Sequence, residues 1–221
     1  MTKFLQWNCR GYYPNFEELG RLIDQHTPKA ICLQELQLCN RALQQPSTYR
    51  LPLVSQHRGA NDRGGAAILF HESVPFTPID IPTHLHAIAA RVHLDSPLSL
   101  CSVYLAPSCK YTKENLCELF RSLPPPLLVL GDFNIRHPLW GDSIASPNAD
   151  WLLDAFQQFS LGCLNSGLPT FERFDTHTSS CVDLSLCSIS NLDRFWWDRS
   201  SFLHGSDHYP IIITSLCPDL P

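Results

Sequence analysis

Hydrophobic positions along the chain fall mostly into short runs rich in Val, Ile and Leu, bounded by Gly, Pro, Asp and other polar residues. Runs of this length and composition predict strands, several of them buried on both faces. We expect strands at residues 3–7, 30–34, 50–54, 65–70, 88–94, 98–104, 127–130, 182–187 and 209–215. The stretch 193–201 has the least regular pattern.

Three other segments repeat their apolar positions with helical spacing. The first begins at Asn15 and stops before Pro28, the second begins at Thr112, and the third begins at Asn148. Asn and Thr are favoured residues at helix N-termini. Many strands with about three interleaved helices predict an α/β fold in which two mixed β-sheets pack together and helices flank them, a four-layer sandwich.

Composition is that of an ordinary globular protein. The chain has 221 residues, of which 44% are hydrophobic and 17% are charged. We therefore expect a single domain covering residues 1–221. The start of the chain has no apolar stretch long enough for a signal peptide, and no run approaches the ~18 residues of a membrane span. These features predict a cytosolic or nuclear protein that is not secreted and has no membrane partner.

The ten cysteines and the net charge of -5 each limit the possible functions. Most cysteines lie inside apolar runs and none forms a C-x-x-C pair, so buried free thiols are favoured over disulfides or a zinc site. The negative charge disfavours strong nucleic-acid binding, which usually depends on basic patches. A site that cleaves phosphodiesters concentrates acidic residues around its metal, however, and this offsets part of the objection.

Polar residues recur within or directly beside the strand-like runs. Gly131-Asp132-Phe133-Asn134 follows one run, and Ser206-Asp207-His208 precedes another. A single Asp at a strand end usually caps a turn or a helix. Seven residues share this position, which favours a common site: Asn8, Glu35, Asp132, Asn134, Asp183, Asp207 and His208. Carboxylates, amides and an imidazole are the groups needed for metal-assisted phosphoester chemistry.

Five ordered motifs resemble those of the exonuclease III-like endonuclease/exonuclease/phosphatase superfamily. They are Trp7-Asn8, Leu33-Gln34-Glu35, residues 131–134, Val182-Asp183-Leu184 and residues 206–208. Within the superfamily the chain is most similar to the endonuclease domains of LINE-type non-LTR retrotransposons of the jockey or I-like kind. The segments 5–11, 63–68, 133–141, 168–171 and 204–210 carry that similarity.

The resemblance implies a Mg²⁺-dependent endonuclease, with Mn²⁺ as a possible substitute, that nicks one strand of double-stranded DNA. The freed 3′-hydroxyl would prime reverse transcription. The domain would be excised from the N-terminus of a polyprotein, and the reverse transcriptase of that polyprotein would be its partner. The isolated domain would be a monomer. The protein would be made in the cytoplasm and would act in the nucleus. The alternatives are a phosphatase of the same superfamily that acts on a small phosphoester and a catalytically dead binding module.

The resemblance also assigns roles to individual residues. Glu35, Asn8 and Asp207 are expected at the metal, and Asp132, Asn134, Asp183, His208, Tyr104 and Asp207 in catalysis. DNA contacts are expected from Thr170, Arg173, His177, Ser180, Ser206 and Arg136, part of them on a groove-entering hairpin at residues 171–180. The pattern departs from that of abasic-site enzymes at Arg10, where those enzymes usually carry an acidic or amide residue. Pro107 also stands one residue farther from Tyr104 than is usual.

Overall fold

The computed structural model describes residues 1–38, 41–50, 53–55, 64–173, 175–176 and 178–216. Its strands form two six-stranded mixed sheets and a separate two-stranded hairpin. In spatial order the first sheet contains β13 (Phe195–Arg199), β14 (Ile211–Ser215), β1 (Lys3–Asn8), β2 (Ala30–Gln34), β4 (Ala66–Phe70) and β3 (Leu53–Ser55). The second contains β5 (Phe76–Ile79), β6 (His86–Val92), β7 (Leu98–Tyr104), β8 (Leu127–Asp132), β12 (Asp183–Ser188) and β9 (Leu161–Cys163).

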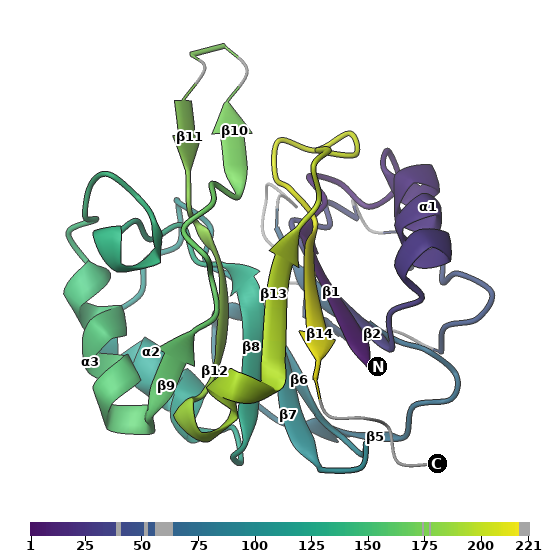
Figure 1. Cartoon of the computed structure of the whole chain (residues 1–221), viewed down its shortest axis with the longest axis horizontal. Helices are drawn as coiled ribbons and strands as arrows, with labels where there is room; N and C mark the ends of the chain where they lie inside the picture. Colours follow the sequence, from purple (N-terminus) through teal and green to yellow (C-terminus); the bar gives the residue numbers. More distant parts are fainter. Residues whose placement is uncertain (39–40, 51–52, 56–63, 174, 177, 217–221) are drawn as a thin grey trace.

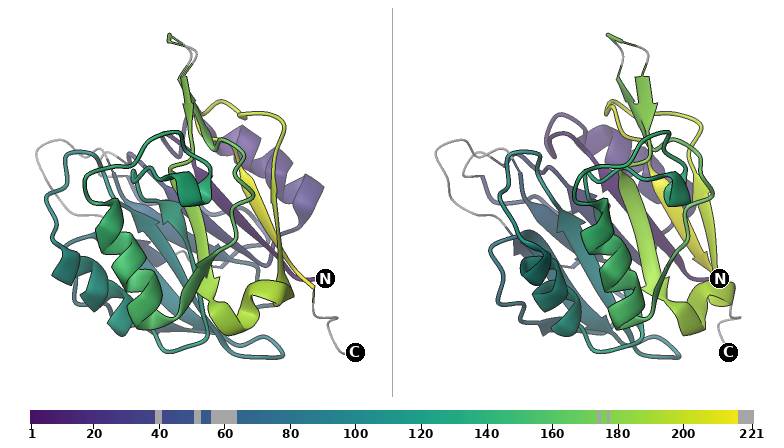
Figure 2. Two further views of the ribbon diagram at one scale, coloured as in Figure 1. Left: turned by 60° about the vertical axis from the view of Figure 1, so that its left-hand side comes forward. Right: turned by 90° about the vertical axis from the view of Figure 1, so that its left-hand side faces the viewer.

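Helices cover the outer faces of both sheets. Helix α1 (Phe16–His26) lies on the first sheet, and α2 (Lys113–Arg121) and α3 (Ala149–Phe159) lie side by side on the second (Figure 1). Two short 3-10 helices, Pro138–Trp140 and Ile189–Arg194, complete the helical structure of the described residues. The left-hand view of Figure 2 places α1 on the opposite side of the sheets from α2 and α3. The predicted four-layer sandwich is therefore confirmed.

Alternation along each strand divides the apolar residues among three cores. In β1, Phe4 points between the two sheets, whereas Leu5 and Trp7 point toward α1. Because successive side chains of a strand point to opposite faces, a strand buried on both faces must be apolar throughout. This explains the near-continuous hydrophobic runs of the sequence. The eight described cysteines are free thiols, and six of them are buried.

Most predicted elements are found within a few residues of their expected bounds, but three strands were missed. The stretch 193–201 was expected to be irregular, and that prediction is wrong, because Phe195–Arg199 forms the edge strand β13. In β13 Trp197 points into the core between the sheets, whereas Trp196 is 62% exposed on the other face. The edge strands β5 and β9 contain four and three residues and give only a weak sequence signal.

Strand register brings the polar strand ends together. Tyr104 at the end of β7 is opposite Asp132 at the end of β8, and Asp132 is opposite Asp183 at the start of β12. Asn8 and Gln34 form the corresponding row in the first sheet. Gly131 permits the close approach of β7 and β8, because a Cβ there would meet the Val103 carbonyl oxygen at 2.0 Å. The hairpin of β10 (Phe171–Arg173) and β11 (Thr178–Ser180) projects from this end of the sandwich (Figure 1).

None of the helices in the described part of the chain has the length and apolar character needed to cross a membrane.

Candidate active site

A buried cluster of two carboxylates and one imidazole forms the centre of the site. The Nδ1 atom of His208 lies 2.7 Å from Oδ2 of Asp183, and Asp132 faces the pair across the β8–β12 register. Asp132 and Asp183 are each 1% exposed and His208 is 5% exposed. One ligand atom of each of the three lies within 4.8 Å of the others, so this cluster is a possible metal site.

The cluster shifts the proton affinity of its own members. Burial alone would lower the pKa of His208, but the adjacent Asp183, with help from Asp132 and Asp207, raises it to about 9. Burial raises the pKa of Asp132 to about 7, and the positive charge of His208 opposes that shift. A buried charge is stable only beside an opposite charge or a hydrogen-bond partner. The site therefore favours an imidazolium held by Asp183, beside an Asp132 that exchanges its proton near neutral pH.

Two amides fix the orientation of Asp132. Asn8 Nδ2 donates to Asp132 Oδ2 at 2.9 Å, and Asn134 Nδ2 donates to the same oxygen at 3.0 Å. The backbone N–H of Asn134 donates to Oδ1 at 3.0 Å. Asn134 adopts a left-handed φ of 50°, a conformation in which Asn is enriched among non-glycine residues. The sequence places Asn8 and Asn134 far apart, and the fold brings both onto one carboxylate.

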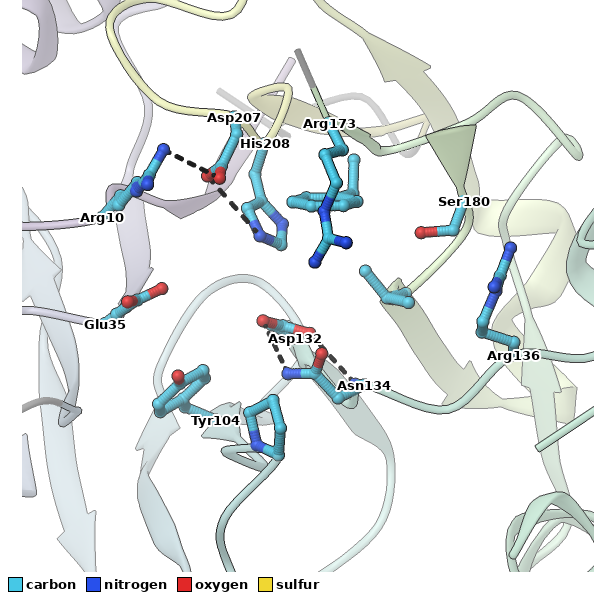
Figure 3. Close-up of a pocket in the computed structure, with 13 residues that line it drawn as sticks. Arg10, Glu35, Tyr104, Asp132, Asn134, Arg136, Arg173, Ser180, Asp207 and His208 are labelled. Atoms are coloured by element: carbon cyan, nitrogen blue, oxygen red, sulfur yellow. Dashed lines mark hydrogen bonds and ion pairs between the residues drawn. The ribbon is translucent and has the colours of Figure 1, made fainter. Parts of the chain in front are cut away.

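An open cavity of about 450 Å³ leads to the cluster (Figure 3). Most of the predicted site residues line it: Glu35, Tyr104, Asp132, Asn134, Arg136, Arg173, Ser180, Asp207 and His208. Arg10, Pro107, Phe171 and Val182 line it as well and were not predicted. Phe171 packs its ring 4.8 Å from that of His208. The sequence does not indicate this apolar contact, except that Phe171 follows the predicted site residue Thr170.

The remaining acidic groups lie on the opposite side of the cavity from Arg136. Glu35 has a left-handed φ of 54° and accepts a hydrogen bond from Gln37 Nε2 at 2.9 Å. Asp207 Oδ1 lies 4.0 Å from His208 Nε2, and its Oδ2 lies 2.9 Å from Arg10 Nη1. Burial, followed by the charges of Glu35, Asp132 and Asp207, raises the pKa of Tyr104 well above its usual value. The Tyr104 hydroxyl therefore retains its proton.

Two predicted DNA contacts lie behind the site instead of on its surface. The Thr170 hydroxyl accepts the backbone N–H of Asp183 at 3.0 Å, and the Ser206 hydroxyl donates to the Asn8 carbonyl at 2.8 Å. Ser206 also accepts the N–H of His208 at 3.2 Å. The two residues are 0% and 3% exposed. Their burial argues against direct DNA contact, and their hydrogen bonds position Asp183 and His208.

The other predicted DNA contacts are near the hairpin and the cavity. Ser180 and Arg173 lie on its two strands, and Arg173 is 60% exposed with Asp175 at 3.8 Å. Arg136 donates through Nε to Asp142 Oδ2 at 2.9 Å. His177 lies outside the described residues. Arg136, Arg173 and Ser180 are thus placed where a bound strand could reach them.

Asp142 is a buried acceptor that holds the loop after β8. Its carboxylate accepts the guanidinium of Arg136 and the backbone N–H groups of Ser143, Ile144 and Cys181. Burial alone would raise the pKa of Asp142, but these hydrogen bonds lower it below its usual value. The carboxylate thus links the Arg136 loop to the segment that leads into β12.

Replacement of Asp142 by Asn is expected to destabilise the domain by about 1.5–3 kcal/mol, because hydrogen bonds to a charged group are lost. A carboxyl with a depressed folded-state pKa stabilises above its unfolded pKa of about 4, and this contribution is lost as pH falls through the folded value. Urea unfolding of both proteins should therefore show a constant gap above about pH 4 that narrows below it. Asp154→Asn, at an exposed ion pair, is the control and should change stability little. A gap that persists unchanged at pH 3 would contradict this role.

Comparisons with known proteins give the family and the relatives of the chain. Residues 98–212 match the endonuclease-reverse transcriptase family. The RNA-directed DNA polymerase from mobile element jockey of Drosophila melanogaster is 27% identical over 214 residues, which is 93% of this chain and 23% of that protein. The probable RNA-directed DNA polymerase from transposon BS, also of Drosophila melanogaster, is 25% identical over 96% of this chain and 24% of its own length. The chain thus spans about a quarter of the length of these relatives.

Solved structures share the fold. The endonuclease domain of TRAS1, a telomere-specific non-LTR retrotransposon, superimposes with a TM-score of 0.79 at 21% identity, over 97% of each chain. The AP endonuclease LMAP from Leishmania major has a TM-score of 0.78 at 15% identity, over 98% of this chain and 88% of its own. The superfamily resemblance and the similarity to jockey-like elements expected from the motifs are both confirmed.

Proposed function

The chain belongs to the endonuclease-reverse transcriptase family, and from this membership we propose that it is a Mg²⁺-dependent endonuclease that nicks one strand of duplex DNA. The observation that carries the proposal is the buried Asp132–Asp183–His208 cluster at the base of a cavity lined by Glu35 and Asp207. The nick leaves a 3′-hydroxyl that primes reverse transcription of a non-LTR retrotransposon.

The biological setting is part of the same proposal. The chain would be a single endonuclease domain from the N-terminus of a polyprotein, and it spans about a quarter of the length of relatives that are named as RNA-directed DNA polymerases. Its partners are double-stranded DNA and the reverse transcriptase of that polyprotein. As an isolated domain it is monomeric, and the full protein is made in the cytoplasm and acts in the nucleus.

The donor set of the cavity fits a hard divalent cation. Glu35 and Asp207 offer carboxylate oxygens, which Mg²⁺ prefers, and within the described residues no hydrogen bond engages the second oxygen of Glu35. We assign the metal to Glu35 and Asp207, with Asn8 beside them, and not to the Asp132–Asp183–His208 cluster, because a protonated His208 that is bound to Asp183 has no lone pair to offer a metal. Asn8 is oriented for a supporting role, because its amide donates to Asp132 and its oxygen accepts the N–H of Arg10. When bound, the ion supplies charge stabilisation to the phosphate oxygens.

The residues of the chain supply the proton transfers. Asp132 accepts a proton from the attacking water, and Asn8 and Asn134 hold its carboxylate in place. The bond from the water oxygen to phosphorus forms as the bond from phosphorus to the 3′-oxygen breaks, and the released 3′-oxygen takes a proton from solvent water to become the 3′-hydroxyl. The His208 imidazolium donates a hydrogen bond to a non-bridging phosphate oxygen, while Asp183 holds its Nδ1 side. Tyr104, which retains its proton, donates a further hydrogen bond to the phosphate. Arg136, Arg173 and Ser180 contact the DNA backbone around this centre.

Nicking of supercoiled plasmid tests the proposal. Wild-type protein with Mg²⁺ is expected to convert supercoiled plasmid to open circles and to leave a small phosphomonoester such as p-nitrophenyl phosphate unhydrolysed. Hydrolysis of the small ester without nicking would favour the phosphatase alternative. Inactivity on both substrates, from a protein with a folded circular dichroism spectrum, would favour the binding module.

Glu35→Gln is expected to raise the Mg²⁺ concentration needed for half-maximal nicking by about tenfold or more, because one charge leaves a hard-cation site whose shape is kept. A magnesium titration of the nicking rate measures the shift. Glu72→Gln, which lies outside the cavity, is the matched control and should titrate like wild type. Excess EDTA should abolish nicking by the wild type and by the variants, and nicking that persists in EDTA would exclude the metal mechanism.

A further inference from the structure

Three carboxylates, those of Glu35, Asp132 and Asp207, line the cavity, and each of its basic groups is paired with a neighbouring carboxylate. His208 is buried against Asp183, and the Nε atom of Arg136 is bound by the buried Asp142. Arg173 is on the projecting hairpin, close to Asp175. A DNA strand that crosses Glu35, Asp132 and Asp207 needs a fixed positive charge on their side of the cavity.

Arg10 supplies a charge in that position. Its guanidinium lies beside Asp207, on the same side of the cavity as Glu35 and across it from Arg136 and Ser180 (Figure 3). The side chain is 56% exposed, whereas that of Asp207 is 17% exposed, so the guanidinium lies at the mouth and the carboxylate lies beneath it.

The backbone beneath Arg10 is held by the loop that carries Glu35. The N–H of Arg10 donates to Asn8 Oδ1 at 3.1 Å, and the N–H of Gly11 donates to the Glu35 carbonyl at 2.8 Å. Arg10 itself has a left-handed φ of 46°, which turns the chain at the end of β1. Asp207 then fixes the far end of the side chain through Nη1 at 2.9 Å. These contacts direct the long, exposed side chain of Arg10 toward Asp207.

Only one guanidinium nitrogen is used in this ion pair. A guanidinium has five N–H donors in a planar fork, and two of them together match a phosphate. We propose that Arg10 binds a backbone phosphate of the DNA on the Glu35 side of the cavity, and that Asp207 holds the fork ready. The proposal rests on the DNA-nicking function argued above and adds a phosphate-binding residue that is not among the predicted site residues.

Salt dependence of binding provides a readout that does not depend on cleavage. Affinity for duplex DNA falls with salt on a logarithmic plot with a slope of about 0.9 per phosphate contact. Fluorescence anisotropy with a labelled duplex in EDTA, over a series of KCl concentrations, is expected to give Arg10→Ala a slope lower than wild type by about 0.9. Arg121→Ala is the matched control, because Arg121 is 53% exposed, pairs with Glu114 and lies outside the cavity. Its slope should equal that of wild type.

Arg10→Lys separates charge from shape and remains informative if Arg10→Ala does not fold. Lysine keeps the positive charge and loses the planar fork, so its slope should match wild type while its affinity is several-fold weaker. A wild-type slope for Arg10→Ala, an equal fall for Arg121→Ala, or wild-type affinity for Arg10→Lys would overturn the role of Arg10. Those results in a protein that still nicks plasmid would leave the proposed function intact. A wild-type protein that neither binds nor nicks DNA would overturn both.

Discussion

His208→Ala is expected to lower the nicking rate by at least about a hundredfold, the scale on which general acid–base groups contribute. The imidazole is buried at the base of the cavity, and its charge is maintained by Asp183 at 2.7 Å. Removal of the ring leaves the buried Asp183 carboxylate without its partner and the phosphate oxygen without its donor. Single-turnover nicking of supercoiled plasmid, with circular dichroism on the same preparation, measures the loss.

Asp183 should act through His208 and not independently of it. Asp183→Asn alone is therefore expected to reduce nicking strongly, whereas adding it to His208→Ala should change the rate little further, since residues that act as a unit are non-additive. His93→Ala is the control, because His93 is exposed and follows the end of β6 that lies away from the cavity. This variant should nick like wild type. A folded His208→Ala protein within about tenfold of wild type would contradict the assignment.

Asp132→Asn is expected to produce the second large loss, again of at least about a hundredfold. The substitution keeps the size of the side chain but removes the group that accepts the water proton. It also turns an amide N–H₂ toward Asn8 or Asn134, both of which donate to this carboxylate. Plasmid nicking under single-turnover conditions measures the rate, and thermal melting measures the cost to the fold.

The matched control is Asp95→Asn, because Asp95 lies in the exposed turn between β6 and β7, away from the cavity. Its nicking rate should equal that of wild type. Loss of activity in Asp132→Asn together with loss of the cooperative melting transition would assign Asp132 to folding. Near-wild-type nicking by a folded Asp132→Asn protein would remove it from the mechanism.

The strand ends that form the site could be predicted because they combine two strong signals. A run such as Leu127–Leu130 has few alternatives to a buried strand, and the polar residues Asp132 and Asn134 interrupt the apolar pattern directly after it. The register between strands is a long-range property. The direct opposition of Asp132 and Asp183 therefore became visible only in the structure.

What the sequence did not predict depends on tertiary contacts. The edge strand Phe195–Arg199 directs two apolar residues to the core between the sheets, the buried Trp197 and the half-buried Phe195, and its Asp and Arg are typical of a loop. Arg10 stood out as a departure from a motif, but its partner Asp207 is distant in sequence. Thr170 was predicted near the site, yet whether its hydroxyl faced DNA or the Asp183 backbone depended on how β10 docks.

The chemistry of the nicked end tests the central claim most directly. Supercoiled plasmid treated with wild-type protein and Mg²⁺ would be supplied with a DNA polymerase and a labelled nucleotide, with Asp132→Asn treated in parallel. Open circles from the wild type should incorporate label at once, because hydrolysis of the bond between phosphorus and the 3′-oxygen leaves a 3′-hydroxyl. The variant should give neither nick nor label. Open circles that accept label only after treatment with a 3′-phosphatase, or an absence of open circles with a folded wild-type protein, would contradict the account.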